Sequence, residues 1–193
     1  MLKAYHHGDL YQTLLNVGEQ ALAEMPLEKV TWREIARRAG VSHAAPKHYF
    51  ASLGHLLAEI AARGFQRFMA AMDEAAQSVP DQSPVPRMAA MGRAYFQFAQ
   101  ANPATYQLMF GQREPMVMTP SLIAASFSSW EQLVSAVSAI TGKSAGPMGA
   151  MHFWSSVHGL SLLRLAQRIP PDVPIHNMLE NQMLKLIGGL KAE

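Results

Sequence analysis

The sequence predicts an all-α protein of about nine helices, organised as a small N-terminal three-helix module followed by a larger helical domain. Apolar residues recur every three to four positions nearly throughout, which is the spacing of helices that bury one face. No segment alternates apolar and polar residues between turn signals, so we expect no strand. Prolines and glycines separate the periodic segments. The expected helices cover residues 8–25, 32–39, 43–50, 53–78, 85–101, 103–111, 120–141, 147–168 and 175–190.

The composition limits the classes of protein to which the chain can belong. It has 193 residues, of which 49% are hydrophobic and 16% charged, so it can bury a substantial core. The absence of cysteine excludes disulfides, thiolate nucleophiles and cysteine-ligated metals. No apolar run is long enough to span a bilayer, and the first residues lack the apolar stretch of a signal peptide. We therefore expect a cytoplasmic protein with no membrane partner.

The chain divides into two parts of different character. The first three expected helices are short and closely connected, whereas those after residue 84 are mostly longer and more apolar. Most of the 13 methionines also lie in the later part, where flexible and polarisable side chains adapt to their surroundings. We place the boundary between residues 1–52 and residues 53–193.

The segment from residue 31 to residue 50 carries the most specific local pattern. Thr31 and Glu34 have the spacing of a capping box, in which each side chain accepts a hydrogen bond from a backbone N–H of the first turn. Gly40 can adopt the left-handed conformation that ends a helix, and Ser42 is a suitable N-cap for the next one. Two short helices joined by so tight a turn predict a helix-turn-helix. The inward face of its first helix is formed by Ile35, Ala36 and Ala39.

The same segment is basic, although the whole chain has a net charge of only +2. Its basic residues are Arg33, Arg37, Arg38 and Lys47, and its only acidic residue is Glu34. Charge alone fits solvated residues on an ordinary helical hairpin equally well. Together with the cap, the turn and the apolar inner face, it favours a helix that enters a DNA major groove.

At this point the sequence resembles the TetR family of transcriptional regulators, and specifically a branch whose C-terminal domain is named for its Trp, His and Gly. The resemblance covers most of the chain and implies an all-α homodimer that binds a palindromic double-stranded DNA operator and is released by a small ligand. The segments that carry it are Tyr5-His6-His7-Gly8-Asp9-Leu10, Ala39-Gly40-Val41-Ser42-His43-Ala44-Ala45-Pro46, Asn102-Pro103-Ala104-Thr105-Tyr106-Gln107-Leu108-Met109-Phe110-Gly111 and Trp154-Ser155-Ser156-Val157-His158-Gly159.

The resemblance also implies which residues would contact DNA. Residues 42–49 would form the recognition helix, and the start of the helix at residue 32 would face phosphate. The implied phosphate contacts are Thr31, Trp32, Arg33, Lys47, His48 and Tyr49, and the implied base-facing residues are His43, Ala44 and Ala45, preceded by Ser42.

Three positions in and beside this helix qualify the expectation. Position 47 is commonly Tyr in the family but is Lys47 here, which keeps a donor for phosphate and loses a ring. Position 53 is commonly Lys and is Leu53 here, so one backbone anchor is missing. Pro46 removes the first hydrogen bond within the expected helix, at a modest cost so close to its end.

The apolar second half contains large side chains spaced to share helix faces. Core packing is the simpler interpretation for each residue alone, whereas the group fits an apolar ligand cavity edged by a few polar atoms. Tyr95, Tyr106 and His158 are the polar candidates, and His158 could instead bind a backbone carbonyl. The candidate residues for an unknown, small, apolar effector are Tyr95, Phe98, Tyr106, Met109, Phe110, Trp130, Phe153, Trp154 and His158.

The last two expected helices, residues 147–168 and 175–190, have apolar stripes that could line the core. The resemblance implies that they pair with the same helices of a second copy.

Other classes of function find less support in the sequence. It has no nucleophile elbow, P-loop, dinucleotide-binding glycines or His-Glu-x-x-His motif, so we expect no catalytic residue and no cofactor. His152 and His158 do not share a helix face, and we expect no metal site. A helical bundle that binds ligands or partners without DNA remains an alternative, against which the basic segment 31–50 argues.

Overall fold

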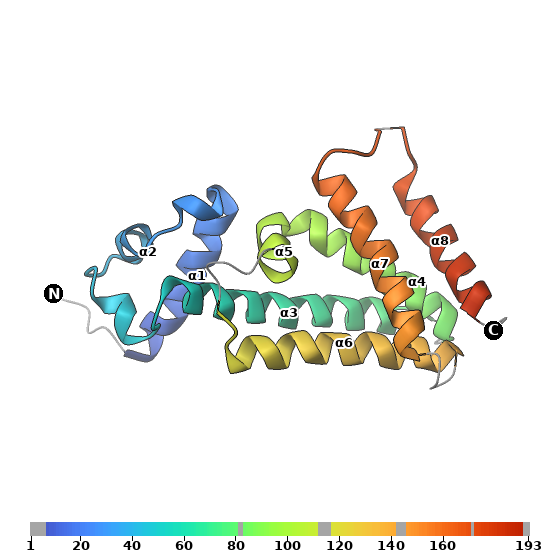
Figure 1. Cartoon of the computed structure of the whole chain (residues 1–193), viewed down its shortest axis with the longest axis horizontal. Helices are drawn as coiled ribbons and strands as arrows, with labels where there is room; N and C mark the ends of the chain where they lie inside the picture. Colours follow the sequence, from blue (N-terminus) through green and yellow to red (C-terminus); the bar gives the residue numbers. More distant parts are fainter. Residues whose placement is uncertain (1–6, 81–82, 112–116, 142–145, 171, 191–193) are drawn as a thin grey trace. The chain divides into compact units, whose positions relative to one another are not determined.

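The computed structural model describes residues 7–80, 83–111, 117–141, 146–170 and 172–190. These residues form eight α-helices and two 3-10 helices and contain no strand, which confirms the all-α fold (Figure 1). None of the described helices is both long enough and apolar enough to cross a membrane. The elements are α1 (His7–Glu24), η1 (Leu27–Lys29), α2 (Trp32–Ala39), η2 (Ala45–His48), α3 (Leu53–Gln77), α4 (Pro84–Ala101), α5 (Pro103–Phe110), α6 (Pro120–Thr141), α7 (Gly146–Leu165) and α8 (Ile175–Leu190).

The expected α-helix over residues 43–50 is wrong, because the chain forms only the four-residue 3-10 helix η2 there. The N–H of Ala45 donates to the carbonyl of Ser42, and that of Lys47 donates to Ala44, each three residues back. An α-helix would need the N–H of residue 46 to bind the carbonyl of Ser42, and Pro46 has no N–H. The Pro46 ring is also buried, so the tight turn is held from within.

One compact unit comprises residues 1–64 together with residues 104–125. Its core is apolar, and the side chains of Leu14, Ile35, Phe50 and Leu56 are inaccessible to solvent. Helices α1 and α2 pack against each other within it. Gly64 on α3 allows a close approach of α5, since a Cβ atom there would lie 2.7 Å from both the Met109 sulfur and the Thr105 methyl. Helix α5 therefore belongs to the same packed unit as the N-terminal helices.

The second compact unit comprises residues 65–103 and 126–193. Within it α4 contacts both α7 and α8, and these two helices contact each other (Figure 1). The buried face of α4 is formed largely by methionine, alanine and aromatic side chains. The division at residue 52, which marks the end of the expected helix-turn-helix module, remains a prediction.

Candidate nucleic-acid interface and interior polar cluster

Helix α2 begins and ends as its sequence predicts. Thr31 has an extended backbone, with φ −131° and ψ 159°, and its hydroxyl oxygen accepts the N–H of Glu34 at 3.3 Å. At the other end Gly40 has φ 67° and ψ 31°, and its N–H donates to the carbonyls of Ala36 and Arg37. Only glycine adopts this left-handed conformation without strain, so the helix stops there. The predicted inward residues Ile35, Ala36 and Ala39 are buried.

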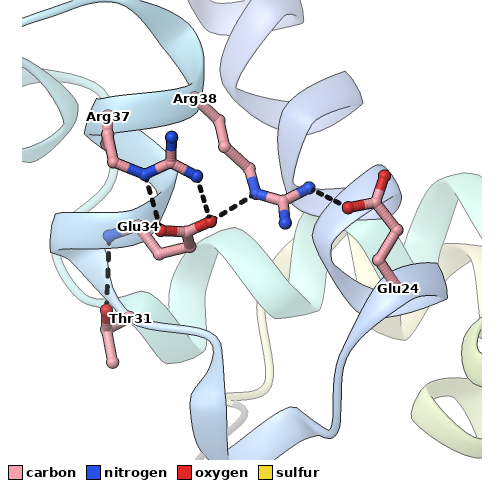
Figure 2. Close-up of polar contacts among 5 residues, drawn as sticks. All are labelled: Glu24, Thr31, Glu34, Arg37 and Arg38. Atoms are coloured by element: carbon pink, nitrogen blue, oxygen red, sulfur yellow. Dashed lines mark hydrogen bonds and ion pairs between the residues drawn. The ribbon is translucent and has the colours of Figure 1, made fainter.

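The Glu34 carboxylate binds two arginine side chains, whereas the capping box predicts that it binds a backbone N–H. Its oxygens accept hydrogen bonds from Arg37, at 2.9 Å from Nε and 2.7 Å from Nη2, and from Nε of Arg38 at 2.6 Å (Figure 2). Arg38 also donates through Nη1 to the Glu24 carboxylate on α1 at 2.6 Å. We call these four side chains the Glu34 cluster. Two adjacent guanidinium groups bind the carboxylate more strongly than a backbone N–H can, because both partners are charged.

The cluster shifts the protonation equilibria of its members. Hydrogen bonds from Arg37 and then Arg38 lower the pKa of Glu34 to about 2. The same hydrogen bonds raise the pKa of Arg37 and of Arg38 above their ordinary value. All three groups are therefore charged at neutral pH, and the carboxylate offsets one of the three positive charges of α2.

The segment after α2 presents its polar side chains outward and its apolar ones inward. Of the residues predicted to contact DNA, most are exposed to solvent, and Trp32, Ala45 and Tyr49 are half-buried. Phe50 is fully buried and stacks on Tyr11 of α1, with ring centroids 4.9 Å apart. Its other neighbour is the ring of His55, which meets it edge-on at 5.7 Å. The exposed predicted residues are Thr31, Arg33, Ser42, His43, Ala44, Lys47 and His48.

The start of α3 is fixed by a local cap that sequence reasoning did not identify. The Ser52 hydroxyl accepts the N–H of His55 at 3.1 Å, and the His55 Nδ1 accepts the N–H of Ala51 at 3.2 Å. Leu53, where a lysine is common in the resembled family, is half-buried and carries no charge. The Ser52–His55 spacing is a helix-start signal that could have been recognised. The burial of Phe50 between Tyr11 and His55 joins three elements and has no such local signal.

In the second unit, Tyr95 lies at the centre of a hydrogen-bonded group. Its hydroxyl is 2.8 Å from Nδ1 of His158, and it accepts the indole N–H of Trp154 at 3.1 Å. Tyr95 is buried, whereas Trp154 and His158 are half-buried. Desolvation lowers the pKa of His158. The structure therefore gives His158 a tyrosine hydroxyl as its partner, where a backbone carbonyl was the simpler expectation.

The remaining candidate effector residues fall into two groups. Trp130 contacts Trp154, with ring centroids 6.3 Å apart. Phe98 and Tyr95 both contact the ring of Phe68 edge-on. Phe153 lines a cavity of about 10 Å³, which is room for about one water molecule. A second group belongs to the first unit, where the rings of Tyr106 and Phe110 lie 4.9 Å apart and Met109 sits beside Gly64. That the nine residues form one effector site stays a prediction.

Two family models match the chain. One, described as bacterial regulatory proteins of the tetR family, matches residues 14–60, which include α2 and η2. The other, described as the C-terminal domain of tetracyclin repressor-like proteins, matches residues 88–186, just over half of the chain. Among curated proteins, no significant sequence match was found.

Solved structures share the fold over nearly the whole chain. A protein of unknown function from Rhodococcus sp. RHA1 is 27% identical, with a TM-score of 0.85 over 98% of this chain and 100% of that chain. A tetR-family transcriptional regulator from Streptomyces coelicolor is 19% identical, with a TM-score of 0.75 over 97% and 84% of the two chains. A TetR family transcription regulator from Marinobacter aquaeolei VT8 is 16% identical, with a TM-score of 0.69 over 93% and 95%.

The family models and the local geometry agree on the same segment. The capped helix α2, the left-handed Gly40 and the exposed segment that follows lie inside the region matched by the N-terminal family model. The second model matches most of α4, all of α5, α6 and α7, and most of α8. The chain therefore belongs to the TetR family of DNA-binding transcriptional regulators, which are not enzymes.

Proposed function

We propose that the protein is a homodimeric repressor that binds a palindromic operator through residues 31–49 and is released by a small apolar effector. The observation that carries the DNA-contacting part is the arrangement of residues 42–50. Buried Pro46 and Phe50 anchor the segment, while His43, Lys47 and His48 remain exposed. Polar side chains on a rigid scaffold are what base and phosphate recognition requires.

In this proposal, the exposed residues divide the work of DNA binding. His43, with Ala44 and half-buried Ala45, contacts base edges, since imidazole can donate or accept and alanine methyls can contact thymine methyls. Lys47, His48 and Tyr49 contact phosphates on one side of the groove. Thr31, Trp32 and Arg33, at the start of α2, contact phosphates on the other.

Replacement of Lys47 by alanine tests the DNA-contacting face. A phosphate contact contributes equally to every DNA sequence, so the variant should bind operator and random DNA more weakly by the same factor. The slope of log K against log salt should become shallower by about 0.9 per protomer. Fluorescence anisotropy over a series of salt concentrations measures this slope. An unchanged slope would remove Lys47 from the phosphate contacts.

Exposed apolar side chains on α7 and α8 support dimerisation through these helices. On α7 several large apolar side chains are exposed, with Met148 at 64% and Leu163 at 51%, and exposed apolar side chains that gather on one surface mark a candidate contact with a partner. An open groove of about 860 Å³ is lined by His152 of α7 and by residues of α8 that include Met178 and Lys185. A second copy related by a two-fold axis would cover this surface and would place two DNA-contacting segments on one duplex.

Sedimentation velocity tests the dimer. Leu163→Glu should yield monomers and lose most operator affinity, because a charge would be buried at the interface. Phe127→Glu, which alters a side chain on α6 that is 58% exposed, is the matched control and should leave the dimer intact. A wild-type protein that is monomeric yet fully binds its operator would contradict the proposal.

Of the nine candidate effector residues, we place five at the effector site of the second unit: Tyr95, Trp154, His158, Trp130 and Phe98. An aromatic shell around a few polar atoms is typical of small-molecule sites, since apolar area supplies affinity and polar atoms fix orientation. Nearby methionines on α4, Met88 and Met91, are buried and can rearrange around a ligand.

A gel shift with the DNA upstream of the protein's own gene, with and without a library of hydrophobic compounds, tests the whole proposal. Retarded DNA that a compound releases would support it. Retarded DNA that no compound releases would support DNA binding and contradict the proposed release by an effector. Repression is tested separately, with a reporter gene placed behind the same DNA. Loss of reporter expression on removal of the protein would contradict repression. No retardation at low salt would favour a bundle that does not bind DNA.

A further inference from the structure

The basic residues between positions 31 and 50 are of two kinds. Arg37 and Arg38 are bound to carboxylates, as described for the Glu34 cluster. In the part of the chain that the structure describes, neither Arg33 nor Lys47 forms an ion pair, and both side chains are exposed. Four basic residues and one acidic residue give residues 31–50 a formal charge of +3. This value overstates the charge that is available to a phosphate, because Arg37 and Arg38 are already paired.

The geometry of the cluster shows which arginine is held by which carboxylate. Glu34 binds Arg37 through two hydrogen bonds, one to each carboxylate oxygen, which is the strongest arrangement for this pair (Figure 2). Arg38 is held from both sides, by Glu34 and by Glu24, and only 18% of its side chain is exposed. Arg37 is 67% exposed and depends on Glu34 alone among the partners that the structure shows.

The charges of the cluster cancel. Two guanidinium groups and two carboxylates sum to zero, and each arginine forms an ion pair with at least one of the carboxylates. An isolated exposed ion pair contributes little to stability, so a phosphate could compete for a single arginine. A shared carboxylate with bidentate geometry is harder to displace, because the arginine would leave a charged acid behind at the DNA surface.

We propose that Glu34 is a positioning residue that withholds Arg37 and Arg38 from the DNA backbone, so that Arg33 and Lys47 supply the phosphate contacts among these four cations. The inference rests on the proposed role of residues 31–49 in DNA binding. Its consequence is a lower and less salt-dependent affinity for DNA of any sequence than the local charge suggests. Recognition then depends more on base contacts and on the spacing of the two half-sites.

The salt dependence of binding to a labelled random-sequence duplex tests this inference. Glu34→Gln should release Arg37 and steepen the slope of log K against log salt by about 0.9 per protomer. It should also raise affinity at low salt several-fold. Arg37→Gln alone should leave the wild-type slope unchanged, because that arginine does not contact phosphate in the parent protein. A flatter slope for Arg37→Gln would overturn the inference.

Two further variants separate the released arginine from other causes. Glu28→Gln removes one negative charge from an exposed residue of η1 and controls for net charge, so it should change the slope far less than Glu34→Gln. The double variant Glu34→Gln/Arg37→Gln should return to the wild-type slope. A double variant as steep as Glu34→Gln would show that net charge or Arg38 is responsible and would contradict the inference. Circular dichroism of each variant verifies that the helices are intact.

The Lys47→Ala variant distinguishes failure of this inference from failure of the proposed DNA-contacting face. If Lys47→Ala and Arg33→Ala both leave the slope unchanged, residues 31–49 are not the phosphate-contacting face. If Lys47→Ala flattens the slope and Arg37→Gln does so equally, the face is correct and the role of Glu34 is wrong.

Discussion

The DNA-contacting region of the first unit and the aromatic interior of the second unit place their polar groups in opposite ways. In the first, Glu34 contacts Thr31 and Arg37, each three residues away along the same helix, close to the surface. In the second, Tyr95 meets His158 and Trp154 across 63 and 59 residues, and its side chain is buried. Contacts between residues three positions apart form wherever the helix itself forms. Distant contacts exist only when the helices are packed, so they can respond to anything that alters the packing.

The largest effect that would sharpen this comparison is expected at Phe50, where the exposed segment depends on the core. Phe50→Ala should lower the free energy of unfolding by about 3–5 kcal/mol, because it removes a fully buried ring and leaves a cavity. It should also weaken DNA binding, since the ring anchors residues 42–50. Urea unfolding measures the first effect. Phe127→Ala, at a side chain that is 58% exposed, is the control, and an equal loss in both variants would contradict the anchoring role.

The second effect concerns the interior polar group. Tyr95→Phe should destabilise the protein by about 1–3 kcal/mol, because the indole N–H of Trp154 and the Nδ1 of His158 both lose a partner. Trp154→Phe removes one of these hydrogen bonds, and a double-mutant cycle between the two sites should show coupling. Chemical denaturation of the four proteins gives the coupling energy. Strictly additive losses would mean that the hydrogen bond does not contribute.

The third effect compares a glycine from each region. Gly40→Ala should destabilise the protein by roughly 1–2 kcal/mol, because φ is 67° while the space around a new Cβ is open. Gly159 lies inside α7, and a Cβ there also meets open space, so Gly159→Ala should instead stabilise it by about 0.5–1 kcal/mol. Thermal unfolding of both variants measures the two signs. The same sign for both would show that something other than backbone conformation dominates.

The smallest effect is the titration of Glu34. Its pKa is lowered from 4.5 to about 2, so the carboxylate stabilises the fold fully above pH 4.5. That contribution should be lost as the pH falls from 4.5 through 2, when the carboxylate is protonated and the arginines lose their acceptor. The carboxyl carbon shift in NMR reports the midpoint directly. Arg37→Gln should raise the midpoint toward 4.5, and an unchanged midpoint would exclude Arg37 as its main cause.

Much of the first region follows from residues close together in the chain. The Thr31 cap, the buried stripe of α2 and the left-handed Gly40 were all predicted correctly, because a helix and its ends depend on signals a few residues apart. The expected α-helix over residues 43–50 was wrong, and local signals conflict there. Ser42 favours a helix start, whereas Pro46 prevents the α-helical hydrogen bond. The chain forms a 3-10 helix there, with the proline ring buried.

The hydrogen-bond partners of the polar residues were less predictable. The capping-box spacing predicts that Glu34 returns to the backbone of Thr31, yet its carboxylate binds two arginines, one of which is held by Glu24 on another helix. Tyr95 and His158 were both selected as polar candidates, but their contact with each other requires α4 and α7 to pack at one register. Tyr106 was selected with them and instead packs in the first unit.

Residue patterns alone were sufficient for the all-α class and for the start, the end and the buried face of α2, since these depend on residues a few positions apart. Packing was needed to show that Glu24 meets Arg38, that the Pro46 ring is buried, and which aromatic side chains share a hydrogen bond. These outcomes depend on the distance between groups that are far apart in the chain, and a one-dimensional pattern carries no information about that distance.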